Sequence, residues 1–127
     1  MKRLAPIASA TFAFCACTTT PGPIVERGYP TGSLGLAAIE RADWATAERL
    51  LTEDRSIAKD DPARLINLGR VYMATGRSDQ AIAVWRQALA ADRHGEVELL
   101  SGRTSTTDQV ARDAIAGYER LLRTASR

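Results

Sequence analysis

LGRVYMATGRSDQAIAVWRQAL, residues 68–89, decides the fold class of this 127-residue chain. Its large apolar residues recur every three or four positions on both sides of a central Thr-Gly-Arg-Ser, which is the spacing of amphipathic helices and not of strands. Gly76 predicts the end of one helix, and Ser78 or Asp79 predicts the N-cap of the next. The stretch therefore predicts two antiparallel helices joined by a short turn.

The small and large residues of this stretch predict how its two helices pack. Gly69 and Ala81 are expected where the helices approach most closely, because a larger side chain would hold them apart. Tyr72 and Trp85 are expected to fill the wedge between neighbouring helices. Asp61-Pro62 marks the start of the first helix, since proline in the first turn lacks only an N–H that would have no helical partner.

The pattern returns 34 residues earlier, where Leu34-Gly35 and Ala47 take the places of Leu68-Gly69 and Ala81. Leu-Gly-x-x-Tyr, then Ala-x-x-x-aromatic, then Ala-Leu at this period resembles the tetratricopeptide repeat. The stretch 42–51, with Asp43-Trp44, also resembles the turn and second helix of this family. The resemblance implies an all-α chain with two helical hairpins at about 28–58 and 62–92, within a repeat region over 33–95. Glycines and prolines at 28–32 are expected to shorten the first helix of repeat one.

The last part of the chain, 96–127, is expected to cover the second repeat. His94-Gly95 predicts the end of the last repeat helix, with Gly95 after the final turn and His94 beside the negative end of the helix dipole. Residues 96–103 alternate briefly and predict a short extended segment. Residues 106–109 form a capping box that starts a last helix, which runs to about Thr124. Its apolar stripe predicts a capping helix, and a dimer or partner interface is the alternative use.

The first residues have the composition of an export signal. Lys2 and Arg3 precede an apolar run of about 13 residues, which is too short to span a bilayer and suits the core of a signal peptide. Phe14-Cys15-Ala16-Cys17 resembles a bacterial lipobox, although Phe14 and Cys15 depart from its usual residues. The resemblance implies a signal peptide over 1–16, cleavage after Ala16 and a lipid on Cys17.

A disulfide or a metal site at the two cysteines has less support. Two cysteines one residue apart would form a strained disulfide, because their Cβ atoms point apart in an extended chain. A metal site needs further ligands, and His94 is the only histidine. An ordinary signal cleaved near residues 8–10 and an uncleaved anchor remain as alternatives. In lipoproteins, Thr18 in place of Asp after the lipidated cysteine favours the outer membrane, facing the periplasm.

The segment between this signal and the repeats is rich in proline and glycine. In 18–32 these residues interrupt both helix and strand periodicity. We therefore expect 17–32 to hold the lipidated cysteine and a flexible, disordered tether. A tether of this length would let the domain stand off a membrane, and a merely disordered start of the chain is the alternative.

The resemblance also implies a concave groove that is lined by the first helix of each repeat and binds a protein or peptide. Ile66 and Met73 indicate a partly apolar ligand, such as a helix or an extended peptide. Only Asn67 and Arg70 could hold a carboxylate tail, so a clamp for such a tail is not expected, and a solvated helix face is the alternative for Arg70. The residues expected in the groove are Ala63, Ile66, Asn67, Arg70 and Met73.

Charge and motifs argue against other functions. The chain has 17 basic and 15 acidic residues, and two of the basic ones lie in the signal, so no basic surface for nucleic acid is expected. No phosphate-binding glycine loop or catalytic set is present, so we expect no enzyme activity, cofactor or metal. The sequence predicts an envelope-anchored adaptor that assists assembly of a pilus, a secretion machine or an outer-membrane complex. A homo-oligomer that completes its own solenoid is the alternative.

Overall fold

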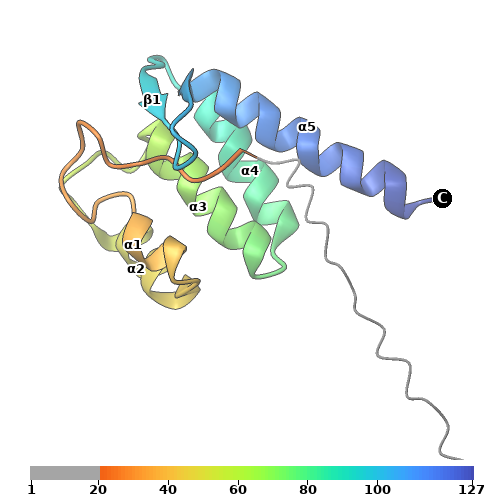
Figure 1. The fold of residues 1–127 in the computed structure, drawn as a ribbon, viewed down its shortest axis with the longest axis horizontal. Helices are drawn as coiled ribbons and strands as arrows, with labels where there is room; N and C mark the ends of the chain where they lie inside the picture. Colours follow the sequence, from red (N-terminus) through yellow and green to blue (C-terminus); the bar gives the residue numbers. More distant parts are fainter. Residues whose placement is uncertain (1–20) are drawn as a thin grey trace, which may run out of the picture.

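The computed structural model describes residues 21–127, so the predicted signal peptide and Cys17 lie outside the described residues. This part of the chain is mostly helical and carries one small hairpin of strands (Figure 1). The predicted all-α class is confirmed, and the two short strands are a minor addition. The elements are α1 (Leu36–Glu40), α2 (Trp44–Glu53), α3 (Pro62–Ala74), α4 (Ser78–Leu89), β1 (Glu96–Glu98), β2 (Thr104–Thr106) and α5 (Thr107–Ala125).

Helices α3 and α4 form the central hairpin, and Gly69 sets how closely they pack. A Cβ atom on Gly69 would lie 2.3 Å from Nε1 of Trp85, which is far inside van der Waals contact. The Trp85 indole N–H donates a hydrogen bond to the carbonyl of Ile66 at 3.1 Å, so the nitrogen-bearing edge of the ring contacts α3. Ala81 is fully buried. The predicted close approach is therefore confirmed at Gly69, and the burial of Ala81 is consistent with its predicted place in the packing.

The ends of these helices follow the sequence signals in part. Asp61 caps α3 by accepting a hydrogen bond from the Arg64 N–H, as its position before Pro62 predicts. Gly76 follows the end of α3 with a φ of 77°, a conformation that favours glycine. The N-cap predicted at Ser78 or Asp79 is wrong, because α4 already begins at Ser78.

Arg77 is the N-cap residue of α4, and its side chain makes no capping bond. Its guanidinium instead donates to the Glu48 carboxylate of α2 at 2.9 and 2.6 Å. It also lies over the ring of Tyr72, 4.7 Å from the centroid. The hydrogen bonds from Arg77 lower the pKa of Glu48. The Arg77 side chain therefore joins the two repeats through Glu48 and does not cap α4.

Repeat one is a shorter version of the same hairpin. Helix α1 has only five residues, as the glycines and prolines before it predict. The turn after it places Ala42 at a φ of 55°, in the position that Gly76 occupies 34 residues later. Asp43 then caps α2 by accepting from the Thr46 N–H at 3.2 Å. The 34-residue repeat thus extends to the backbone conformation of the turn, even where glycine is absent.

Residues 21–25 form a strap across α3, and this corrects the expected flexible tether. The Ile24 side chain is fully buried in the main core. The Val25 N–H donates to the Glu98 carbonyl, and the Leu100 N–H donates to the Pro23 carbonyl, both at 2.9 Å. These bonds place the strap beside β1 as an additional extended segment (Figure 1). For residues 21–32 the prediction of a disordered tether is wrong, because an apolar side chain and paired backbone groups hold the segment.

The link between α4 and α5 differs from the prediction at its start. Helix α4 ends at Leu89, with Ala90 as C-cap, so His94 and Gly95 do not end it. The His94 ring nitrogen Nδ1 lies 3.1 Å from the Thr107 hydroxyl, and the Gly95 carbonyl accepts from the Thr107 N–H at 3.0 Å. Both residues therefore hold the start of α5. The short extended segment is confirmed as β1, which pairs with β2 in antiparallel register.

Helix α5 begins where predicted but without the capping box. Thr106 is the N-cap residue and makes no capping bond, while the Gln109 amide donates to Asp113 at 2.8 Å. Hydrogen bonds from Thr106 and Arg112 lower the pKa of Asp108 to about 2. The first half of α5 packs on α3 and α4 and buries Val110, Ala111 and Ala114. Residues 119–127 are all exposed, and α5 extends past the other helices (Figure 1).

We predict that Gly69→Ala lowers the free energy of unfolding by about 1–3 kcal/mol, because the added methyl group displaces Trp85. Urea unfolding followed by tryptophan fluorescence measures the change. Gly95→Ala is the matched control, since nothing lies within 4 Å of its added Cβ. Equal stability of both variants would contradict a close packing of α3 and α4 at Gly69.

Candidate functional site

Four of the five residues expected in the groove line one cavity of about 180 Å³. They are Ile66, Asn67, Arg70 and Met73, which lie along α3 at the spacing of one helix face. Ala63 does not line the cavity and is fully buried in the core. Ala63 therefore belongs to the packing, and a role of the other four in binding a partner stays a prediction.

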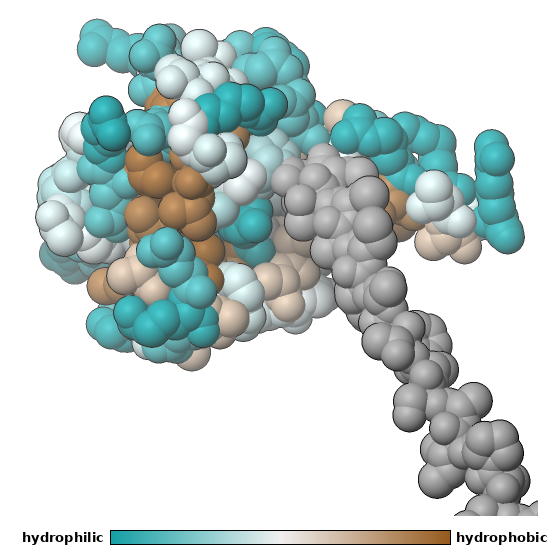
Figure 2. Space-filling view, in the orientation of Figure 1, coloured by the Kyte–Doolittle hydropathy of each residue, from teal (hydrophilic) through white to brown (hydrophobic). Residues whose placement is uncertain are grey.

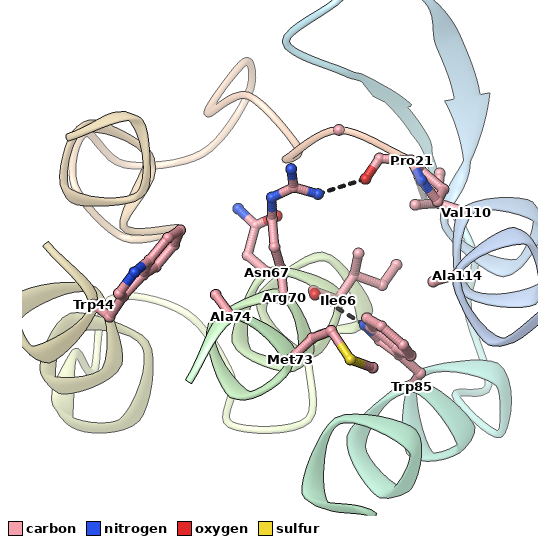
Figure 3. A pocket seen from close by; sticks show the side chains of 11 residues that line it. Pro21, Trp44, Ile66, Asn67, Arg70, Met73, Ala74, Trp85, Val110 and Ala114 are labelled. Carbon is pink, nitrogen blue, oxygen red and sulfur yellow. Dashed lines mark hydrogen bonds between the residues drawn. The ribbon is translucent and has the colours of Figure 1, made fainter. Parts of the chain in front are cut away.

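The cavity is closed by elements that the sequence pattern did not assign to a site. Trp44 faces it from the start of α2, across from Arg70 and Ala74 (Figure 3). The sequence pattern assigns Trp44 to the turn of repeat one and the apolar stripe of α5 to capping. The only signal that these residues would face α3 is the helical periodicity of the apolar positions around them. The full lining is Pro21, Gly22, Trp44, Ile66, Asn67, Arg70, Met73, Ala74, Trp85, Val110 and Ala114.

Asn67 is fully buried, and its hydrogen bonds hold the strap and repeat one against α3. Its Oδ1 accepts from the Ile24 N–H at 2.9 Å, and its Nδ2 donates to the carbonyls of Ile24 and Leu34 at 3.1 and 3.0 Å. The Asn67 amide was expected to bind a ligand, but it binds the backbone of Ile24 and Leu34 of this chain. Asn67 is therefore a structural residue of the site.

Arg70 is the charged residue of the cavity. Its NH1 group donates to the Pro21 carbonyl at 2.6 Å, at the rim of the cavity (Figure 3). Burial lowers the pKa of Arg70 below its ordinary value. None of the ion pairs observed in residues 21–127 includes Arg70, so no carboxylate in this part of the chain pairs with it.

The strap covers the part of α3 that lies next to the cavity. Residues 23–25 cover α3 at Asn67, and the open part is the cavity between Trp44, Arg70 and α5. Figure 2 shows apolar side chains gathered in a strip on one face of the molecule, with polar side chains on both sides. A ligand would therefore meet a short apolar cavity with one cation, and not a long open groove.

Residues 21–127 lack the features of a metal centre and of a membrane span. This part of the chain holds no group of three His, Cys, Asp or Glu side chains that could bind a metal ion. In the same residues no helix combines the length and apolar character needed to cross a bilayer. The cavity itself contains one ionisable side chain, that of Arg70.

The repeated hairpins define a short helical repeat protein, with an apolar cavity between its helices and the strap. A sequence model of the tetratricopeptide repeat matches residues 38–103, and the chain belongs to this family. Comparison with curated proteins and with solved structures gave no match. Repeats of this family generally mediate protein–protein interactions and are typically not catalytic.

We predict that Asn67→Leu lowers the free energy of unfolding by about 3 kcal/mol, because it leaves three buried backbone groups without a partner. Hydrogen exchange measured by NMR should become fast at the Ile24 amide. Gln87→Leu, which removes an exposed amide on α4, is the control and should change neither quantity appreciably. Continued slow exchange at Ile24 in Asn67→Leu would contradict the role of the amide.

Proposed function

We propose that this protein is a non-enzymatic adaptor of the bacterial cell envelope, which binds a protein partner in the cavity and assists assembly of an envelope complex. The cavity is the observation that carries the binding role. Trp44, Met73 and Ala74 line it without being fully buried, so they offer apolar contact area to a partner. Aromatic residues and methionine are enriched at the centres of protein interfaces.

The location rests on the sequence alone. The lipobox-like Phe14-Cys15-Ala16-Cys17 supports a lipid on Cys17 and an outer-membrane site that faces the periplasm. Cys17 is four residues from Pro21, which is held at the rim of the cavity. Four residues span at most about 14 Å, so a lipid on Cys17 would keep the cavity close to the membrane. A partner would then be met at the membrane surface, as in assembly of a pilus, a secretion machine or an outer-membrane complex.

We predict that a palmitate analogue labels the protein in growing bacteria and that Cys17→Ser abolishes the label. In the same cells, a photo-crosslinking amino acid in place of Ala74, at the cavity rim, should give a discrete partner adduct. The control is the same substitution at Ala83, which is exposed on α4 outside the cavity. Label retained in Cys17→Ser would refute the anchor, and equal adducts from both positions would refute the binding site.

A second function is favoured by the exposed end of α5. Leu121 and Leu122 are 48% and 49% exposed, on turns that have no fully buried residue. Apolar surface at this end of α5 is visible in Figure 2. Two copies that pack these helix ends together would bury the leucines and extend the solenoid. Self-association is therefore the alternative proposal.

This alternative predicts a concentration-dependent molar mass for the protein in light scattering. Leu121→Glu with Leu122→Glu should then give a monomer at every concentration, because charges replace the apolar contact. Ala83→Glu, which adds a charge on an exposed face of α4, should leave the mass unchanged. A wild-type protein that stays monomeric at high concentration would exclude self-association.

A further inference from the structure

We propose that the cavity recognises an acidic peptide segment, in which one bulky apolar side chain fills the cavity and the carboxylate of a neighbouring Asp or Glu pairs with Arg70. This inference rests on the proposed binding function and adds the chemistry of the ligand. Three features carry it: the size of the cavity, the environment of Arg70 and the groups that the chain itself occupies.

The size of the cavity fits a single side chain. Its volume is about 180 Å³, and cavities of about 150 Å³ lined by apolar side chains bind a benzene ring. The lining side chains around Met73 are aliphatic or aromatic, apart from Asn67 and Arg70. A Phe, Leu or Met side chain of a partner therefore fits by volume and by polarity, whereas a whole helix does not.

Arg70 adds a charge requirement at the rim. It is partly buried, and within residues 21–127 its hydrogen-bond partner is the Pro21 carbonyl, so other N–H groups of the guanidinium can serve a ligand. A desolvated cation gains most from a carboxylate, which accepts two parallel hydrogen bonds from a guanidinium. Among residues 21–127 no Asp or Glu lines the cavity, so an acidic partner would complete the site.

Two other arginines show that this arrangement is particular to Arg70. Arg64 is 2% exposed and donates to the carbonyls of Leu51 and Ile57, away from the cavity. Arg77 is paired with Glu48. Arg64 therefore holds a loop and Arg77 joins two repeats, whereas Arg70 lines the cavity and has no ion pair with an acidic residue of 21–127.

The carboxylate is assigned to a side chain of the partner and not to its C-terminus. Sites that capture a chain terminus commonly use a nest of backbone N–H groups. Here Arg70 supplies the charged donors, and the Asn67 amide is already bonded to Ile24 and Leu34. The mouth of the cavity therefore suits one residue pair within a longer segment.

The first experiment selects random peptides, displayed within a loop so that they have no free C-terminus, on the full-length protein in detergent. We expect enriched peptides to carry Asp or Glu beside Phe, Leu, Met or Trp. Selection on Arg70→Gln should lose the acidic preference and keep the apolar one. Selection on Arg86→Gln, which removes an exposed arginine on α4, should match the wild type.

The second experiment is a double-mutant cycle with one enriched peptide, synthesised with both ends blocked. Replacing its acidic residue by the corresponding amide should weaken binding to the wild type about tenfold or more, because a charged hydrogen bond is lost. The same peptide change should have little effect on Arg70→Gln. Ala74→Trp, which fills the cavity from an exposed helix position, should abolish binding, and thermal melts confirm that each variant is folded.

Each contrary result overturns a stated part of the proposal. Enrichment without acidic residues, or an equal effect of the peptide change on wild type and Arg70→Gln, removes the role of Arg70. Binding that needs a free C-terminus removes the side-chain assignment, and failure to enrich any peptide removes the ligand class. If the crosslink at Ala74 still captures a partner in cells, the proposed binding function stands while this ligand chemistry fails.

Discussion

The hydrogen bonds of the Asn67 amide connect the parts of this small domain. The amide lies on the central helix and binds the backbone of the strap at Ile24 and of repeat one at Leu34. A buried amide without partners would cost several kcal/mol, so α3 requires both segments to be in place. The neighbours of Ile24 are bonded to Glu98 of β1 and to Leu100, and β1 pairs with β2, which leads into α5. A chain with only two repeats thereby gains a covering layer that neither repeat supplies by itself.

The helical hairpin could be predicted from sequence because its signals are local and its contacts are short-range. Gly69 and Trp85 are close in sequence, and a glycine inside a helix pattern, opposite a large ring, strongly indicates a close approach of two helices. The strap could not be predicted in the same way. Its prolines and glycines are typical of disorder, and the order comes from one buried isoleucine and from Asn67, 43 residues away. The proline and glycine content of the strap does not show its conformation, because that conformation depends on hydrogen bonds to Asn67, which is distant in sequence.

The wrong assignments at the helix ends have a related cause. Arg77 stands where a local capping residue is expected, and its side chain is drawn to Glu48 and Tyr72 of other helices. His94 and Gly95 have the composition of a helix end, yet they bond to Thr107 at the start of the next helix. In both places a tertiary contact prevails over a local signal, since a cap is worth only about 1 kcal/mol. The cavity also depends on tertiary contacts that local sequence signals do not show, because its walls come from four helices and the strap.

The strap would also connect the cavity to the membrane anchor if Cys17 carries a lipid. Pro21 is part of the cavity rim and its carbonyl accepts a hydrogen bond from Arg70, so the backbone that leads toward Cys17 is in contact with the charged residue of the site. If Cys17 carries a lipid, the membrane anchor lies four residues from the Pro21 carbonyl that Arg70 binds. A ligand that pairs with Arg70 would contact the same guanidinium. Binding and anchoring would then act on the same hydrogen bond, the one between Arg70 and Pro21. A long flexible tether would separate the two processes, and the bonded strap leaves only residues 18–20 between them.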